Sequence, residues 1–83
     1  MKFSVTIVPQ AQKDFRKIPK TDQAKIRRKI STLETSPFYG KKLEGELASL
    51  YTLRAWPYRI IYQVFKKNEV YVVHILHRQG AYR

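Results

Sequence analysis

Three β-rich runs in the second half of the chain constrain its fold more than any other feature. They span residues 50–54, 58–65 and 69–76, and they are dense in Val, Ile, Tyr and Phe, which favour strands. Only a few residues separate each run from the next. A parallel crossover needs a dozen or more residues, so such close neighbours pair antiparallel. The second half is therefore predicted to form a three-stranded antiparallel meander.

The first half predicts one strand followed by two short helices. Residues 3–7 alternate between apolar and polar side chains, which is typical of a strand with one buried face. Apolar residues then recur at helical spacing on both sides of Pro19, with Thr21 or Asp22 as the expected N-cap of the second helix. The helical apolar positions are Ala11, Phe15, Ile18, Ile26, Ile30 and Leu33.

This order predicts a single α+β domain over residues 1–83, with the succession β-α-α-β-β-β. A helical hairpin is expected to pack on one face of a small, mostly antiparallel sheet. The longest apolar runs fall well short of the roughly 20 residues that span a membrane, and no secretory signal is visible. The chain has no Cys, which excludes disulfides and zinc–thiolate sites. A cytoplasmic location is the expectation.

The charge balance points to a polyanionic partner. Seventeen Lys and Arg residues stand against six Asp and Glu residues, for a formal net charge of +11. Such a chain repels itself when compact, and an anionic partner relieves that repulsion. Nucleic acid, an anionic membrane surface and an acidic protein all qualify. A hydrophobic fraction of 43% argues against a disordered basic tail.

Alternation along the second strand of the meander separates two sets of side chains. The even positions, from Tyr58 to Val64, form the better core face, which leaves Arg59 on the opposite, open face. If residues 55–58 form the turn, Arg54 becomes the cross-strand neighbour of Arg59. Two guanidinium groups repel at that spacing unless an anion lies between them. The pair is either a bidentate phosphate clamp or two solvated strand arginines.

Further candidate residues cluster at the carboxyl end and in the loops. His77 and Arg78 offer an acid or base together with charge stabilisation, or they form a plain polar strand end. Tyr82 either stacks on a base or folds back onto the sheet. Trp56 is read as a hydrophobic plug in preference to a stacking platform. Glu46 is a weak candidate for a general base. The sequence contains no phosphate-binding glycine loop or metal-ligand cluster, so the expected site uses no metal and no cofactor.

The chain resembles the RelE/ParE superfamily of bacterial toxin–antitoxin systems over nearly its whole length. The resemblance rests on the element order and on three segments, namely 41–45, 53–62 and 77–83. It implies the toxin of a type II system that cleaves messenger RNA in the ribosomal decoding site. In that reaction the 2′-hydroxyl attacks the adjacent phosphate and the 5′-oxygen leaves. The resemblance also implies an acidic antitoxin as partner.

Carried over by position, the resemblance assigns three roles. Arg59 matches the arginine that stabilises the transition-state phosphate, Arg78 matches an arginine near the leaving group, and Tyr82 matches the residue that stacks on the substrate base. Some RelE toxins carry lysines on the strand before the hairpin, one of them proposed as the base. Leu50 and Thr52 occupy those positions here.

The missing lysines leave the general base open. His77 is the first substitute and Glu46 the second, while Lys42, Arg54 and Arg83 are expected to position the substrate. ParE-like members of the superfamily inhibit DNA gyrase on the same scaffold, often with a longer helical hairpin. The short hairpin here favours the ribonuclease branch. A noncatalytic basic RNA-binding domain is the remaining alternative.

Overall fold

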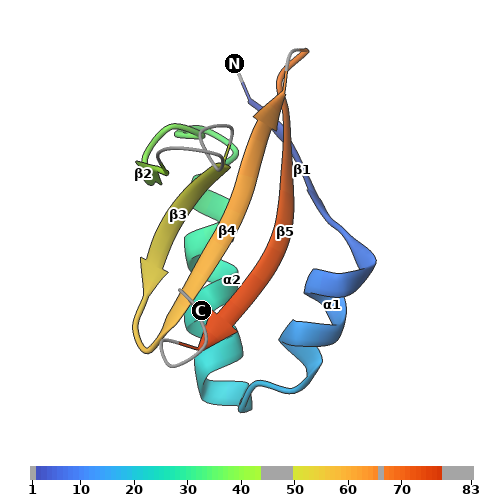
Figure 1. The fold of residues 1–83 in the computed structure, drawn as a ribbon, viewed down its shortest axis with the longest axis vertical. Coiled ribbons are helices and arrows are strands. Elements are labelled where there is room, and N and C mark those ends of the chain that lie inside the picture. The colour runs from blue at the N-terminus through green and yellow to red at the C-terminus, as the bar shows by residue number, and fades with distance from the viewer. Residues whose placement is uncertain (1, 44–49, 66, 78–83) are drawn as a thin grey trace.

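The computed structural model describes residues 2–43, 50–65 and 67–77, which form two helices against one face of a five-stranded sheet (Figure 1). The predicted α+β class and the β-α-α-β-β-β succession are confirmed, and one short strand, β2, is added in a segment for which the sequence predicted no element. The elements in chain order are β1 (Ser4–Ile7), α1 (Pro9–Arg16), α2 (Lys20–Thr32), β2 (Lys41–Lys42), β3 (Leu50–Ala55), β4 (Tyr58–Phe65) and β5 (Glu69–His77).

The strands lie in the order β1-β5-β4-β3-β2. The meander of β3, β4 and β5 is antiparallel as predicted, and β1 pairs parallel with β5 through the register Val5↔Val70. Two-residue β2 extends the sheet beside the first half of β3. Within the described ranges, no helix is long and apolar enough to cross a membrane.

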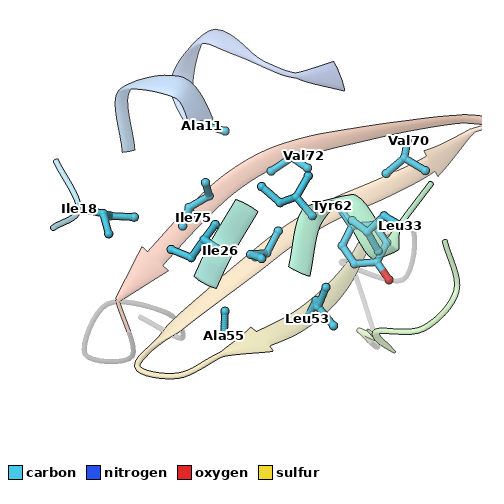
Figure 2. Close-up of a cluster of buried hydrophobic side chains, with 12 residues drawn as sticks. Ala11, Ile18, Ile26, Leu33, Leu53, Ala55, Tyr62, Val70, Val72 and Ile75 are labelled. Carbon is cyan, nitrogen blue, oxygen red and sulfur yellow. The ribbon is translucent and has the colours of Figure 1, made fainter. Parts of the chain in front are cut away.

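The core lies between the sheet and the helices (Figure 2). Ile60 and Tyr62 of β4 are fully buried there, as the alternation predicted. Burying a side chain of that size stabilises the fold by about 1.5–3 kcal/mol. The other buried side chains in this cluster are Ala11, Ile18, Ile26, Ile30, Leu33, Leu53, Ala55, Val70, Val72 and Ile75.

The start of α2 differs from the prediction. The helix begins at Lys20, and its N-cap is Pro19, with no capping hydrogen bond from a side chain. The predicted caps Thr21 and Asp22 lie inside the first turn instead. The Pro19 carbonyl accepts hydrogen bonds from the amides of Asp22 and Gln23, at 3.0 and 2.9 Å. Because the ring of Pro19 restricts its φ to the helix-compatible range, the chain turns into the helix two or three residues earlier than predicted.

A β-bulge in β5 decides which side chains lie on which face of the sheet. Ile61 pairs with His74 and Tyr62 pairs with Val72, so Val73 is an extra residue on β5. Because side chains of a strand alternate between the two faces of the sheet, one extra residue turns every later side chain of β5 to the opposite face. Ile75 consequently joins the core. His77 pairs with Tyr58, on the helix side of the sheet.

Candidate functional site

A cationic groove of about 1050 Å³ lies along β3, next to β2 and α2. Its walls are α2, β2 and the turn that joins β3 to β4. Six of the described lining residues are cationic and none carries a carboxylate, so the groove attracts anions. The lining residues are Lys25, Lys29, Tyr39, Gly40, Lys41, Lys42, Leu43, Thr52, Leu53, Arg54, Ala55, Trp56 and Arg59.

Arg54 and Arg59 are direct cross-strand partners at the end of the β3–β4 hairpin. This confirms the pairing expected from the sequence. Partners of this kind have Cβ atoms about 4.5–5.5 Å apart, and two like charges destabilise the pair. Arg54 is exposed and Arg59 is half-buried. A phosphate between the two guanidinium groups would replace the repulsion with charge-assisted hydrogen bonds.

The short strand β2 contributes a third cation to the face that carries Arg54 and Arg59. Lys41 pairs with Thr52 and Lys42 pairs with Tyr51, so successive lysines point to opposite faces. Thr52 lies on the same face as Arg54, two residues along β3. The predicted substrate-binding residue Lys42 lines the groove, but Lys41 is the lysine on the arginine face. Lys41 was missed because no strand was predicted there.

Two lysines of α2 form the opposite wall of the groove. Lys25 and Lys29 lie one helical turn apart, and both line it. The Lys25 Nζ donates a hydrogen bond of 2.6 Å to the carbonyl oxygen of Trp56 and lies 3.6 Å from the Asp22 carboxylate. This contact connects α2 to the β3–β4 turn.

Two exposed aromatic side chains also line the groove. Tyr39 is 66% exposed and Trp56 is 53% exposed. The reading of Trp56 as a hydrophobic plug is therefore wrong, because a plug would be covered by the side chains it seals. Its position at the tip of a tight hairpin, between exposed Arg54 and half-buried Arg59, leaves more than half of its surface open.

A buried tyrosine holds the start of β2 against the sheet. The Gly40 amide donates a hydrogen bond of 2.9 Å to the Tyr62 hydroxyl. A Cβ at Gly40 would lie 2.6 Å from that hydroxyl oxygen and 2.7 Å from the Thr52 carbonyl oxygen, so only glycine fits. Burial raises the pKa of the Tyr62 phenol, and the hydrogen bond from Gly40 partly opposes this effect. The backbone next to Lys41 is therefore held against Tyr62, which is buried in the core.

Thr52 presents a second polar group beneath the groove. Its side chain is 5% exposed, and its Oγ1 has no hydrogen-bond partner. An unsatisfied buried hydroxyl costs about 1–3 kcal/mol.

The structure does not bring His77 and Arg59 together. The His77 ring packs edge-on against Tyr58, with centroids 5.3 Å apart, and Tyr58 belongs to the core face. Arg59 pairs instead with Leu76, on the other face. The bulge at Val73 is the physical reason, because it reverses the alternation in the last part of β5. The predicted site residues Glu46, Arg78, Tyr82 and Arg83 lie outside the described residues.

The groove has the chemistry of a phosphodiester site. Guanidinium and ammonium groups supply hydrogen-bond donors and charge, and the guanidinium fork matches phosphate oxygens. The described ranges contain no group of three or more His, Cys, Asp or Glu residues that could hold a metal ion. What the described walls offer a substrate is positive charge, hydroxyl groups and aromatic surface.

Comparison with known proteins shows two sequence relationships. A family model described as the ParE toxin of the parDE type II toxin–antitoxin system matches residues 5–82. A Methanocaldococcus jannaschii protein named as toxin RelE1 is 32% identical over 89 residues, which cover 100% of this chain and 98% of that protein.

Solved structures share the fold over most of the chain. The toxin–antitoxin complex RelBE2 of Mycobacterium tuberculosis contains a chain with a TM-score of 0.87 and 26% identity, covering 94% of this chain and 100% of that one. The archaeal RelE–RelB complex of Pyrococcus horikoshii contains a chain with a TM-score of 0.82 and 28% sequence identity, and the match covers 98% of this chain and 100% of that one. A mutant of the E. coli toxin RelE in the free state has a TM-score of 0.80 and 27% sequence identity, and the match covers 98% of this chain and 88% of that one.

Proposed function

The chain belongs to the RelE/ParE superfamily of type II toxin–antitoxin toxins, on its RelE-like branch, and from this membership we propose that it is a ribosome-dependent messenger RNA endoribonuclease. The protein is the toxin of such a system. Cleavage of messenger RNA on the ribosome, with arrest of translation, is the activity that the groove supports best. We further propose that residues 1–83 act as one toxin domain.

One observation supports this proposal more than any other. Arg54 and Arg59 face each other across β3 and β4, inside a groove whose described lining is cationic and free of carboxylates. A phosphate bound between two cross-strand arginines would offset their mutual repulsion and accept charge-assisted hydrogen bonds from both. Charge stabilisation of this kind is often the largest single contribution to catalysis at phosphorus and carbonyl centres.

The proposed reaction is a transesterification within the RNA strand. The 2′-oxygen of the ribose attacks the adjacent phosphorus and loses its proton. The bond from phosphorus to the 5′-oxygen breaks, and that oxygen takes up a proton. The products are a 2′,3′-cyclic phosphate and a free 5′-hydroxyl. Arg59 stabilises the extra negative charge on the phosphate oxygens, while Arg54 and Lys41 hold the phosphate in place.

The ribosome is proposed to supply orientation. No imidazole or carboxylate is found among the described residues that line the groove, and His77 lies on the other face of the sheet. Holding the 2′-oxygen in line with phosphorus is worth an effective molarity of about 10⁵–10⁸ M in well-oriented systems. From the resemblance we propose Arg78 beside the leaving oxygen, Tyr82 on the substrate base, Glu46 as a candidate base, and Lys42 and Arg83 as substrate contacts.

An acidic antitoxin is the proposed protein partner. The solved complexes from Mycobacterium tuberculosis and Pyrococcus horikoshii each join a RelE-type chain to its antitoxin. The net charge of +11 favours a partner of opposite sign, because electrostatic complementarity speeds encounter and excludes wrong partners.

The test is a comparison of three activities of the purified protein. We expect messenger RNA to be cut on programmed ribosomes, naked RNA to be cut poorly, and gyrase supercoiling to continue unaffected. Loss of gyrase supercoiling without RNA cleavage would identify a ParE-like target. RNA binding without scission in any assay would leave only the noncatalytic alternative, and fast cutting of naked RNA would contradict the role of the ribosome.

A further inference from the structure

We propose that the groove binds single-stranded RNA by stacking two of its bases on Tyr39 and Trp56, while the lysines and arginines between them hold the phosphates. This assignment deepens the proposed function and rests on it for the identity of the polymer. Sequence patterns indicated a stacking platform at Trp56 only as the alternative to a hydrophobic plug, and they assigned Tyr39 no role.

The exposure of the two rings is the first argument. Tyr39 and Trp56 are 66% and 53% exposed, and both line the same groove. Leaving large aromatic surfaces in water is unfavourable, so aromatic surface gathered at one site usually marks an interaction. Tyr39 reaches the groove from the β2 side, and Trp56 reaches it from the β3–β4 turn, so the rings belong to different walls.

The second argument is the charge between them. Trp56 lies two residues after Arg54 and three residues before Arg59, while Tyr39 lies two residues before Lys41. Each ring is therefore next to a phosphate-binding cation. Alternation of aromatic platforms with backbone-binding cations is the usual composition of single-strand sites, because every base offers a π-face and every linkage carries a charge.

The third argument is the size and openness of the groove. Its volume of about 1050 Å³ is at the upper limit of sites for single drug-sized ligands, which run from about 300 to 1,000 Å³. Residues of α2, β2 and the β3–β4 turn all line it, so it offers contacts to more than one nucleotide. An acidic polypeptide would match the charge of the groove but would not explain two flat platforms beside it.

Fluorescence tests the proposal directly, because Trp56 is the only tryptophan in the chain. The probes are a 2′-O-methyl hexaribonucleotide, which cannot be cleaved, and inorganic polyphosphate of similar charge, which has no bases. We expect both probes to bind at low salt and only the oligonucleotide to quench Trp56. Equal quenching by the two polymers would overturn base stacking at Trp56.

Variants separate stacking from charge. Tyr39→Ala and Trp56→Ala should each weaken oligonucleotide binding by about 5- to 100-fold, the range expected for losing one stacked base, and leave polyphosphate binding within twofold. Tyr39→Phe and Trp56→Phe should restore most of the affinity. Phe65→Ala is the matched control, because Phe65 is 43% exposed and lies at the other end of β4. Equal losses for both polymers, or no loss for either, would contradict the proposal.

The design separates failure of this inference from failure of the nuclease activity. A protein that fails to cut RNA on ribosomes but shows base-dependent quenching keeps the stacking site and loses the proposed reaction. A protein that cuts on ribosomes but binds the two polymers alike loses the stacking site only. If the two alanine variants bind RNA normally and lose antitoxin affinity, the surface is a protein interface and the stacking proposal is wrong.

Discussion

His77 packs edge-on against Tyr58, with ring centroids 5.3 Å apart and ring planes at 87°, on the helix side of the sheet. Arg59 is the next residue along β4 and lies on the opposite side, paired with Leu76. The imidazole and the guanidinium are thus separated by the sheet itself. A proton transfer at a phosphate bound by Arg59 requires hydrogen-bond reach, which this arrangement does not give.

His77→Ala should therefore keep most of the cleavage rate. We expect single-turnover cleavage on ribosomes within about threefold of wild type, because the lost group does not face the substrate. Removing the ring contact with Tyr58 should cost about 0.5–1.5 kcal/mol of unfolding free energy. A loss of 100-fold or more in rate, with an unchanged melt, would make His77 the base and contradict the face assignment.

Thr52→Val should stabilise the protein. Its Oγ1 is buried without a hydrogen-bond partner, and valine replaces the hydroxyl with a methyl group of similar size. Removing an unsatisfied polar group should raise the free energy of unfolding by roughly 1 kcal/mol. Thr6→Val, at an exposed position of β1, is the matched control and should change the free energy of unfolding by less than about 0.5 kcal/mol. A lower melting temperature for Thr52→Val alone would mean that the hydroxyl is satisfied.

Tyr62 should make stability depend on pH in the alkaline range. Burial raises the pKa of its phenol above the ordinary value of 10.0, so the folded protein keeps this proton when the unfolded chain has lost it. The resulting stabilisation is fully present below pH 10 and is lost as pH rises through the higher folded pKa. Denaturant unfolding from pH 8 to 11 should show a steeper decline for wild type than for Tyr62→Phe. If wild type and Tyr62→Phe lose stability equally as the pH rises, the Tyr62 phenol is not the source of the pH dependence.

Sequence patterns predicted the elements because their periods are clear. The alternation from Tyr58 to Val64 assigned the core face of β4, and the turn near Trp56 placed Arg54 opposite Arg59. Both predictions depend on local spacing alone. Strand β2 was missed, because a pair of lysines has no alternation and its strand character comes from pairing with β3.

The candidate site was less predictable, because three of its features depend on the folded chain rather than on local spacing. The bulge at Val73 leaves no composition signal, yet it moves His77 to the helix face. Lys25 reaches the carbonyl of Trp56 across 31 residues, so the helix wall of the groove emerges only from packing. The close approach of Gly40 to Tyr62 likewise needs the folded chain.

Binding of the antitoxin, which we propose to be acidic, should depend strongly on salt. The screening length falls from about 30 Å at 0.01 M to about 8 Å at 0.15 M ionic strength, and the toxin has a net charge of +11. We expect the association rate constant to fall about tenfold or more over that range, because steering accelerates encounter by such factors. Stopped-flow mixing measures this rate. A rate independent of salt would show that apolar contact, rather than charge, controls the encounter.

The central claim is that Arg59 stabilises the phosphate during cleavage. Single-turnover cleavage on programmed ribosomes, with a thermal melt of each variant, tests it most directly. Arg59→Ala should lose about 100-fold or more in rate, with only a small change in stability. Arg59→Lys should recover part of the rate, because it keeps the charge and loses the bidentate fork.

Arg28→Ala is the matched control for this measurement, since Arg28 is exposed on α2 and is not one of the residues that line the groove. It should cut at the wild-type rate. Only the Arg59 variants should lose rate, while all variants should melt close to wild type. An Arg59→Ala protein that is folded and cuts at the wild-type rate would contradict it.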